Sequence, residues 1–227
     1  MTSPTGALRS EDSWGGEIWS SLVGSLDTIL RACYGIYEFT DDPDCLLRIG
    51  LSLAREPVTL RDGTAIEIGD PIGCLHFWNE HLPRYSDLGP DLRWAAEMRR
   101  RVLRSLMALA VYVEEEAAWR NVNAFRAYAA FSSRVGVLQL YRVTRRLGFE
   151  WVPGGPSTAR ALAGSITGYG LTRAYNPAAL ARQPFFRRSH EIWISRAALL
   201  DLHRRQQALS DRSAAYRRRE KPRRTGG

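Results

Sequence analysis

The sequence contains few cysteines, and they are far apart. Cys33, Cys45 and Cys74 are separated by 12 and 29 positions. These spacings match neither a Cys-x-x-Cys metal pair nor an even-numbered disulfide framework. We therefore expect small buried hydrophobic cysteines in a reducing compartment, and neither a cofactor nor a bound metal.

Long apolar runs are also missing. No stretch reaches the roughly 18 to 20 uncharged residues that a membrane-spanning helix requires. The N-terminus opens on Thr2, Ser3, Pro4 and Thr5 rather than on a basic segment followed by an apolar one. These absences predict a cytoplasmic protein without a transmembrane segment.

Net positive charge is nearly absent outside the C-terminal segment. The net charge of the chain is +8, and nine positive against two negative residues between Arg204 and Arg224 leave +7 in that segment. The body of the protein is therefore close to neutral, which argues against a nucleic-acid-binding face on it. Two roles stay open for the tail: a solubilising segment without a partner, or a contact with a polyanion or an anionic membrane surface through Arg217, Arg218, Arg219, Arg223 and Arg224.

The length of 227 residues fits one domain with tails. Polar residues 1–13 are predicted to be disordered, residues 14–207 to form a single α/β domain, and residues 208–227 to form a disordered arginine-rich tail. Apolar residues recur every three or four positions over 14–34, which indicates an amphipathic helix. Docking on the core explains this helix better than contact with a membrane, since its polar face lacks basic residues before Arg31.

Alternation and turn residues predict the strands of the first half. Residues 47–53 alternate with a period of two, 58–60 and 64–68 flank a hairpin turn at Gly63, and 72–78 are apolar enough for the middle of a sheet. Asp91 is a good N-cap for a helix of about 25 residues. The acidic run 114–116 marks the end of that helix, where the helix dipole disfavours negative charge.

The second half predicts a β-α-β unit. A strand at 125–131, a helix ending at Gly148 and a strand at 149–152 suggest parallel neighbours joined by a right-handed crossover. A last strand at 190–195 leads into a helix that runs toward Gln207. We expect an α/β fold with a single mixed sheet, an N-terminal β-hairpin region, a β-α-β crossover and helices packed on the sheet.

One segment resembles a known family. Its matching residues follow the pattern DG-x-x-I-x-x-GD-x-I-x-x-LH-x-x-N of the bacterial YkoP-like domain: Asp62, Gly63, Thr64, Ile66, Gly69, Asp70, Ile72, Leu75, His76 and Asn79. The resemblance covers roughly residues 15–202 and includes the helix-to-strand junction at 147–150. It implies an α/β fold that occurs alone or attached to polysaccharide deacetylase domains, without an established activity or catalytic residues. The sequence contains no deacetylase module, so any link to polysaccharide or envelope metabolism is indirect.

His76 is the most suggestive polar side chain, because it interrupts an apolar strand and Asn79 follows where that strand ends. One interpretation is a small hydrolase or transferase that uses His76 with Asn79 and His190. The other is a core histidine that fixes strand pairing through a buried hydrogen bond. A metal site at His76 and His81 is disfavoured, because a spacing of five puts them on opposite faces of a strand.

The remaining candidates lie elsewhere in the chain. Ser195 fits a helix N-cap better than a nucleophile, and no spacing favours a triad of Ser195, His76 and Asp70. Glycines at 164, 168 and 170 lack a phosphate-loop motif. If the domain binds an anionic small molecule or glycan, the predicted ligand-binding residues are Asp70, Tyr169, Tyr175 and Arg187. We expect a non-catalytic accessory or ligand-binding domain, with the histidine-based enzyme as the alternative.

Overall fold

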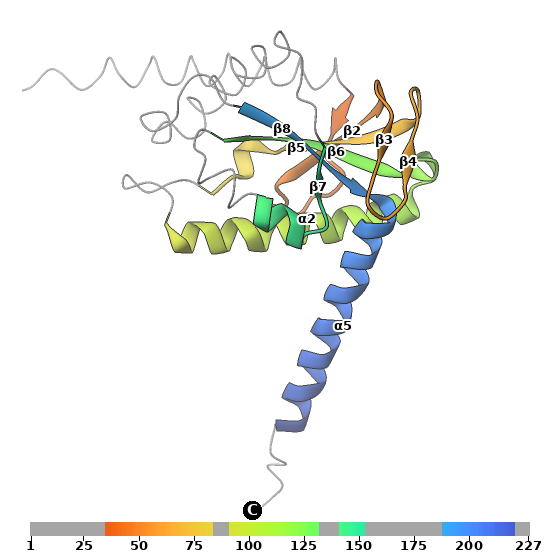
Figure 1. Cartoon of the computed structure of the whole chain (residues 1–227). Coiled ribbons are helices and arrows are strands. Elements are labelled where there is room, and N and C mark those ends of the chain that lie inside the picture. The colour runs from red at the N-terminus through yellow and green to blue at the C-terminus, as the bar shows by residue number, and fades with distance from the viewer. Residues whose placement is uncertain (1–34, 84–90, 132–140, 153–187, 221–227) are drawn as a thin grey trace, which may run out of the picture.

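The computed structural model describes residues 35–83, 91–131, 141–152 and 188–220 (Figure 1). The helix predicted at 14–34, the disordered segment predicted at 1–13 and the end of the predicted tail lie outside these residues. So does the tyrosine- and arginine-rich segment at 169–187. The fold and the candidate site are built from the described part of the chain.

Six strands form one mixed sheet, in the order β1-β2-β5-β6-β8-β7. Their bounds are β1 Ile36–Tyr37, β2 Leu47–Leu53, β5 Pro71–Phe77, β6 Ala124–Phe131, β7 Glu150–Trp151 and β8 Arg188–Ser195. Neighbouring β5 and β6 run parallel and all other neighbours run antiparallel. The predicted mixed α/β sheet is therefore confirmed, and β5 lies inside it as its apolar sequence indicates.

The parallel pair is joined by helix α2, Leu92–Glu115, followed by the short helix η2, Ala117–Trp119. This β5-α2-β6 connection is the β-α-β crossover of the fold. The sequence pattern places it instead between β6 and β7. Those strands do run parallel, since both are antiparallel to β8, but β8 lies between them. The position of β8 between β6 and β7 depends on pairing between residues far apart in the sequence.

Helix α2 begins and ends where its local residues predict. The Asp91 carboxylate accepts a hydrogen bond from the backbone N–H of Trp94 at 2.7 Å, so Asp91 is the N-cap. The helix ends at Glu115 with Glu116 as its C-cap. Its apolar stripe packs against one face of the sheet and makes the main core with β2, β5, β6 and β8, including the buried residues Leu106, Leu109, Val113, Ile49, Leu75, Phe125, Ile192 and Ile194.

Gly73 is required in β5 because the chain passes close to two aromatic rings. A Cβ atom at this position would lie 2.2 Å from Cδ1 of Phe125 and 3.2 Å from Cζ3 of Trp119. Both rings are fully buried. The glycine therefore lets Phe125 fill the space between β5 and the helices that follow.

Two predicted turns appear as expected. The hairpin β3-β4, Val58–Thr59 and Ala65–Ile66, turns through Gly63 at a φ of 86° and forms a separate two-stranded sheet. Residues 141–146 are helical, and Gly148 takes a φ of 91° just after them. The N–H groups of Gly148 and Phe149 bond to the carbonyls of Arg145 and Thr144, which is a Schellman C-cap.

The last helix is longer than the sequence pattern predicts. Helix α5 spans Arg196–Glu220, whereas we expected an end near Gln207 and disorder from 208 onward. The segment 208–220 contains neither glycine nor proline, and the first proline is Pro222. Nothing in its local sequence breaks the helix, and residues 208–220 are helical in the structure.

Candidate functional site

The two faces of the sheet differ in chemistry. Cross-strand partners share a face, so the register places His76 with Arg48, Cys74 with Arg126, and Arg126 with Trp193 on the side opposite to the core under α2. Tyr128 pairs with Glu191 on the same side. We define the polar sheet face as Cys74, His76, Arg126, Tyr128, Glu191 and Trp193.

Arg126 is at the centre of this face and is only 8% exposed. Its Nη1 lies 3.5 Å from Oε1 of Glu191, and its Nη2 lies 3.6 Å from Sγ of Cys74. Its guanidinium carbon lies 5.3 Å from the ring centre of Tyr128 and 5.7 Å from that of Trp193. The single carboxylate contact is long for an arginine pair, so the buried charge is incompletely satisfied by these neighbours.

Two N–H donors of the polar sheet face are buried without an acceptor in the part of the chain that the structure describes. Nε of Arg126 and Nε1 of Trp193 have no hydrogen-bond partner among the described residues. A buried donor without a partner costs about 1–3 kcal/mol. Both donors belong to cross-strand neighbours on the same face of the sheet.

His76 is held neutral beside Arg126. Burial, and then the positive charge of Arg126, lower the pKa of His76 to about 4. The imidazole is therefore uncharged near neutral pH and offers one N–H donor and one nitrogen acceptor. It adds hydrogen-bonding capacity to the face without adding a second charge.

A second group of polar residues adjoins β5 but is internally paired. Nη2 of Arg48 lies 3.1 Å from Oε1 of Glu38 and 3.5 Å from Oε1 of Glu80. Its guanidinium covers the ring of Trp78 at 4.8 Å, and the Trp78 ring stacks on His81 at 3.7 Å. This arrangement fixes the end of β5.

His81 is further fixed by its backbone contact, because its Nδ1 lies 2.9 Å from the carbonyl oxygen of Cys45. In the described ranges, no three histidine, cysteine or acidic residues are grouped as a metal site requires.

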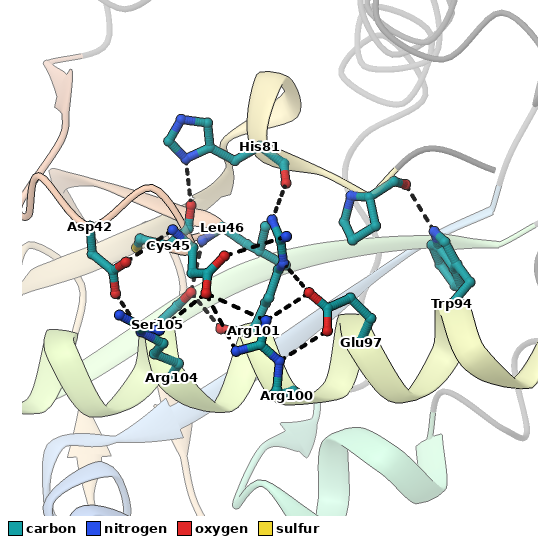
Figure 2. Close-up of polar contacts among 12 residues, drawn as sticks. Asp42, Cys45, Leu46, His81, Trp94, Glu97, Arg100, Arg101, Arg104 and Ser105 are labelled. Atoms are coloured by element: carbon teal, nitrogen blue, oxygen red, sulfur yellow. Dashed lines mark hydrogen bonds and ion pairs between the residues drawn. The ribbon is translucent and has the colours of Figure 1, made fainter.

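A third polar group, shown in Figure 2, ties the loop before β2 to α2. Asp42 and Asp44 form ion pairs with Arg100, Arg101 and Arg104 at 2.6–3.4 Å. Hydrogen bonds from Arg100 and Arg101 also lower the pKa of Glu97 to about 2. Every charge here has a close partner, so this cluster stabilises the loop and offers no unsatisfied group.

Ser105 completes the same connection inside the protein. Its hydroxyl is fully buried, accepts a hydrogen bond from the Leu46 N–H at 2.8 Å and donates one to the Arg101 carbonyl at 2.8 Å. The residue just before β2 is thereby fixed on α2 (Figure 2).

The three histidine-based enzyme candidates do not converge. His190 pairs with Ala129 and shares the face of Ile192 and Ile194, so it lies on the opposite side of the sheet from His76. Its ring lies 4.6 Å from that of Trp151. Asn79 begins the short helix η1, Asn79–His81, after β5.

The other predicted candidates have local roles or fall outside the described residues. Ser195 is the N-cap of α5, as predicted: its hydroxyl accepts from the Ala198 N–H at 2.9 Å and donates to the Asp62 carboxylate. Asp70 accepts the Glu67 N–H at 2.8 Å and closes the turn before β5. The triad of Ser195, His76 and Asp70 is therefore not assembled. Tyr169, Tyr175 and Arg187 lie outside the described residues.

Sequence reasoning missed the residues at the centre of the polar sheet face. Arg126, Glu191 and Trp193 are close only because β6 and β8 pair antiparallel. The sequence carries no signal for this burial, because Arg126 occupies the polar phase of the alternating strand, opposite to Phe125 and Ala127, where a solvent-exposed charge is the expectation.

Together these observations define a mixed α/β domain with its main apolar core on one face of the sheet. The other face carries a smaller apolar cluster, which includes Trp193 and residues of the β3-β4 hairpin, beside a polar group with two buried donors that lack a partner among the described residues. The chain belongs to the YkoP domain family, whose model matches residues 17–203. No curated protein and no solved structure matches the chain significantly. Within the described ranges, no helix has the length and apolar character needed to cross a membrane.

Proposed function

We propose that this protein is a non-catalytic ligand-binding domain, and that its polar sheet face binds an acidic sugar or a similar small hydroxylated carboxylate. The observation that carries the proposal is the pair of buried donors without acceptors, Nε of Arg126 and Nε1 of Trp193. An oxygen-rich anion supplies the acceptors that both groups lack among the described residues.

The chemistry of the face favours a carboxylate. A guanidinium binds a carboxylate through paired N–H groups, and it does so more strongly where water is excluded. Neutral His76 can donate or accept at the same face without repelling cationic Arg126. Hydroxyl groups of a sugar suit the remaining donors and acceptors, and this ligand class agrees with the polysaccharide context that the family resemblance implies.

The geometry gives less support to the enzyme alternative. His76 and His190 occupy opposite faces of the sheet, and Ser195 is used as a helix cap. Nucleophilic or acid–base catalysis needs its groups within hydrogen-bond reach of one another or of one reacting atom.

Calorimetric titration of the full chain tests the proposal, with glucuronate, glucose and acetate as probes. Glucuronate is expected to bind, glucose to bind at least tenfold more weakly, and acetate to bind weakly because it lacks hydroxyl groups. Equal affinity for glucose and glucuronate, or no glucuronate binding at millimolar concentration, would overturn the proposal.

Variants locate the binding. Arg126→Gln removes the charge, and Trp193→Phe removes the indole N–H together with part of the ring volume while keeping an aromatic ring. Each is expected to weaken glucuronate binding about tenfold or more, the effect of removing one charge-assisted hydrogen bond. Arg99→Gln, at an exposed position of α2, is the matched control. If Arg126→Gln does not fold, Trp193→Phe still decides, since unchanged binding by that variant contradicts the assigned site.

A further inference from the structure

The C-terminal part of α5 extends away from the rest of the protein (Figure 1). Leu199 and Leu202 are buried against the core, whereas every residue from Gln207 to Arg217 is exposed. We call residues 204–220 the projecting helix. It is an addition to the family domain, because the family match ends at residue 203.

The projecting helix lacks an apolar surface for packing. Its sizeable apolar residues are Leu209 and Tyr216, which are 55% and 63% exposed. An isolated helix of this length is marginal in water without a partner. Two such residues make neither the heptad seam of a coiled coil nor the broad apolar face that inserts into a membrane surface.

Its charge is strongly positive instead. Six arginines and two acidic residues lie between Arg204 and Glu220, a net charge of +4. Arg205, Arg212 and Arg219 recur every seven residues, which places their backbone positions along one side of the helix. Arg204 and Arg212 are exposed.

Arg205 already has one partner, but an exposed one. Its Nη2 lies 2.8 Å from Oδ2 of Asp201, and the two side chains are 63% and 54% exposed. Exposed pairs of this kind contribute little to stability. Arg205 can therefore exchange this carboxylate for a phosphate at small cost.

We propose that the projecting helix binds the phosphate backbone of double-stranded nucleic acid without reading its sequence. Its 17 residues make a rod of about 25 Å, which suits contact along a duplex groove. The planar guanidinium of arginine matches phosphate geometry. A single aromatic residue, Tyr216, does not provide the stacking platforms that single-stranded binders use.

Fluorescence anisotropy tests this with the full-length chain and a labelled DNA duplex of about 20 base pairs and arbitrary sequence, titrated in about 50 and 200 mM salt. The helix variant is Arg204→Gln/Arg205→Gln/Arg212→Gln. The control variant is Arg93→Gln/Arg99→Gln/Arg120→Gln, which removes the same charge from exposed positions of the body.

The helix variant is expected to bind the duplex at least tenfold more weakly than the parent protein, and the control to bind within about twofold of it. The slope of log affinity against log salt should fall by about 0.9 for each phosphate that the helix variant no longer neutralises. A sequence-scrambled duplex should bind equally well.

Four results would overturn the proposal. The first is equal weakening of duplex binding by both variants, which indicates a net-charge effect. The second is tighter binding to vesicles containing phosphatidylserine than to the duplex, and the third is tighter binding to single-stranded DNA than to the duplex. The fourth is no binding to the duplex at the lower salt concentration. The glucuronate titration reports on a different face, so the two proposals can fail independently.

Discussion

Replacing His76 with glutamine is expected to remove a pH dependence of stability. Burial and the charge of Arg126 lower the pKa of His76 from 6.5 to about 4 in the folded protein. Between these values the unfolded chain binds a proton at this residue and the folded protein does not. The free energy of unfolding therefore falls as the pH decreases through this window.

The magnitude follows from the two pKa values. Above the unfolded pKa, both states are neutral at His76 and the residue contributes no pH dependence. At about pH 5, protonation of His76 in the unfolded chain lowers the free energy of unfolding by about 2 kcal/mol. Below the pKa of the folded protein this decrease approaches about 3 kcal/mol. The groups that face His76 are its cross-strand partner Arg48, Cys74 on the same strand, and Arg126. Of these groups, Arg126 disfavours the imidazolium through its positive charge.

Urea unfolding followed by tryptophan fluorescence, at about pH 7.5 and pH 5, measures the effect. The parent protein and a His203→Gln control should both lose the His76 contribution on acidification, and His76→Gln should lose about 2 kcal/mol less. The same loss in His76→Gln as in the parent would refute the reasoning. So would an NMR titration that places the pKa of His76 above about 6.

Two further substitutions test the packing. Gly73→Ala should destabilise the protein by about 1–3 kcal/mol, because its methyl group would overlap the buried Phe125 ring. Phe125→Leu should then destabilise the Gly73→Ala variant less than it destabilises the parent protein. If the two effects on the free energy of urea unfolding simply add, the assigned clash is wrong. Ser105→Ala should cost about 1–3 kcal/mol by leaving the buried Leu46 N–H without its acceptor; an unchanged unfolding midpoint would show that this link to α2 contributes nothing.

Local patterns in the sequence predicted most of the elements, because each depends on residues a few positions apart. Alternation predicted β2, the Asp91 carboxylate predicted the start of α2, and Gly148, which takes a positive φ, predicted a helix end. The same local reasoning identified Ser195 as a cap rather than a nucleophile. For α5, composition indicated disorder where an uninterrupted helical segment continues to Glu220.

Only the tertiary structure decided which strands are neighbours and what the polar sheet face contains. The insertion of β8 beside β6 brings Arg126 to Trp193 and Glu191, and it places His190 on the face away from His76. Strand order depends on contacts between residues far apart in the chain. The hydrophobic periodicity of a single segment does not indicate which other strand it pairs with. The sequence by itself thus determined the elements and the family, whereas long-range pairing determined the candidate site.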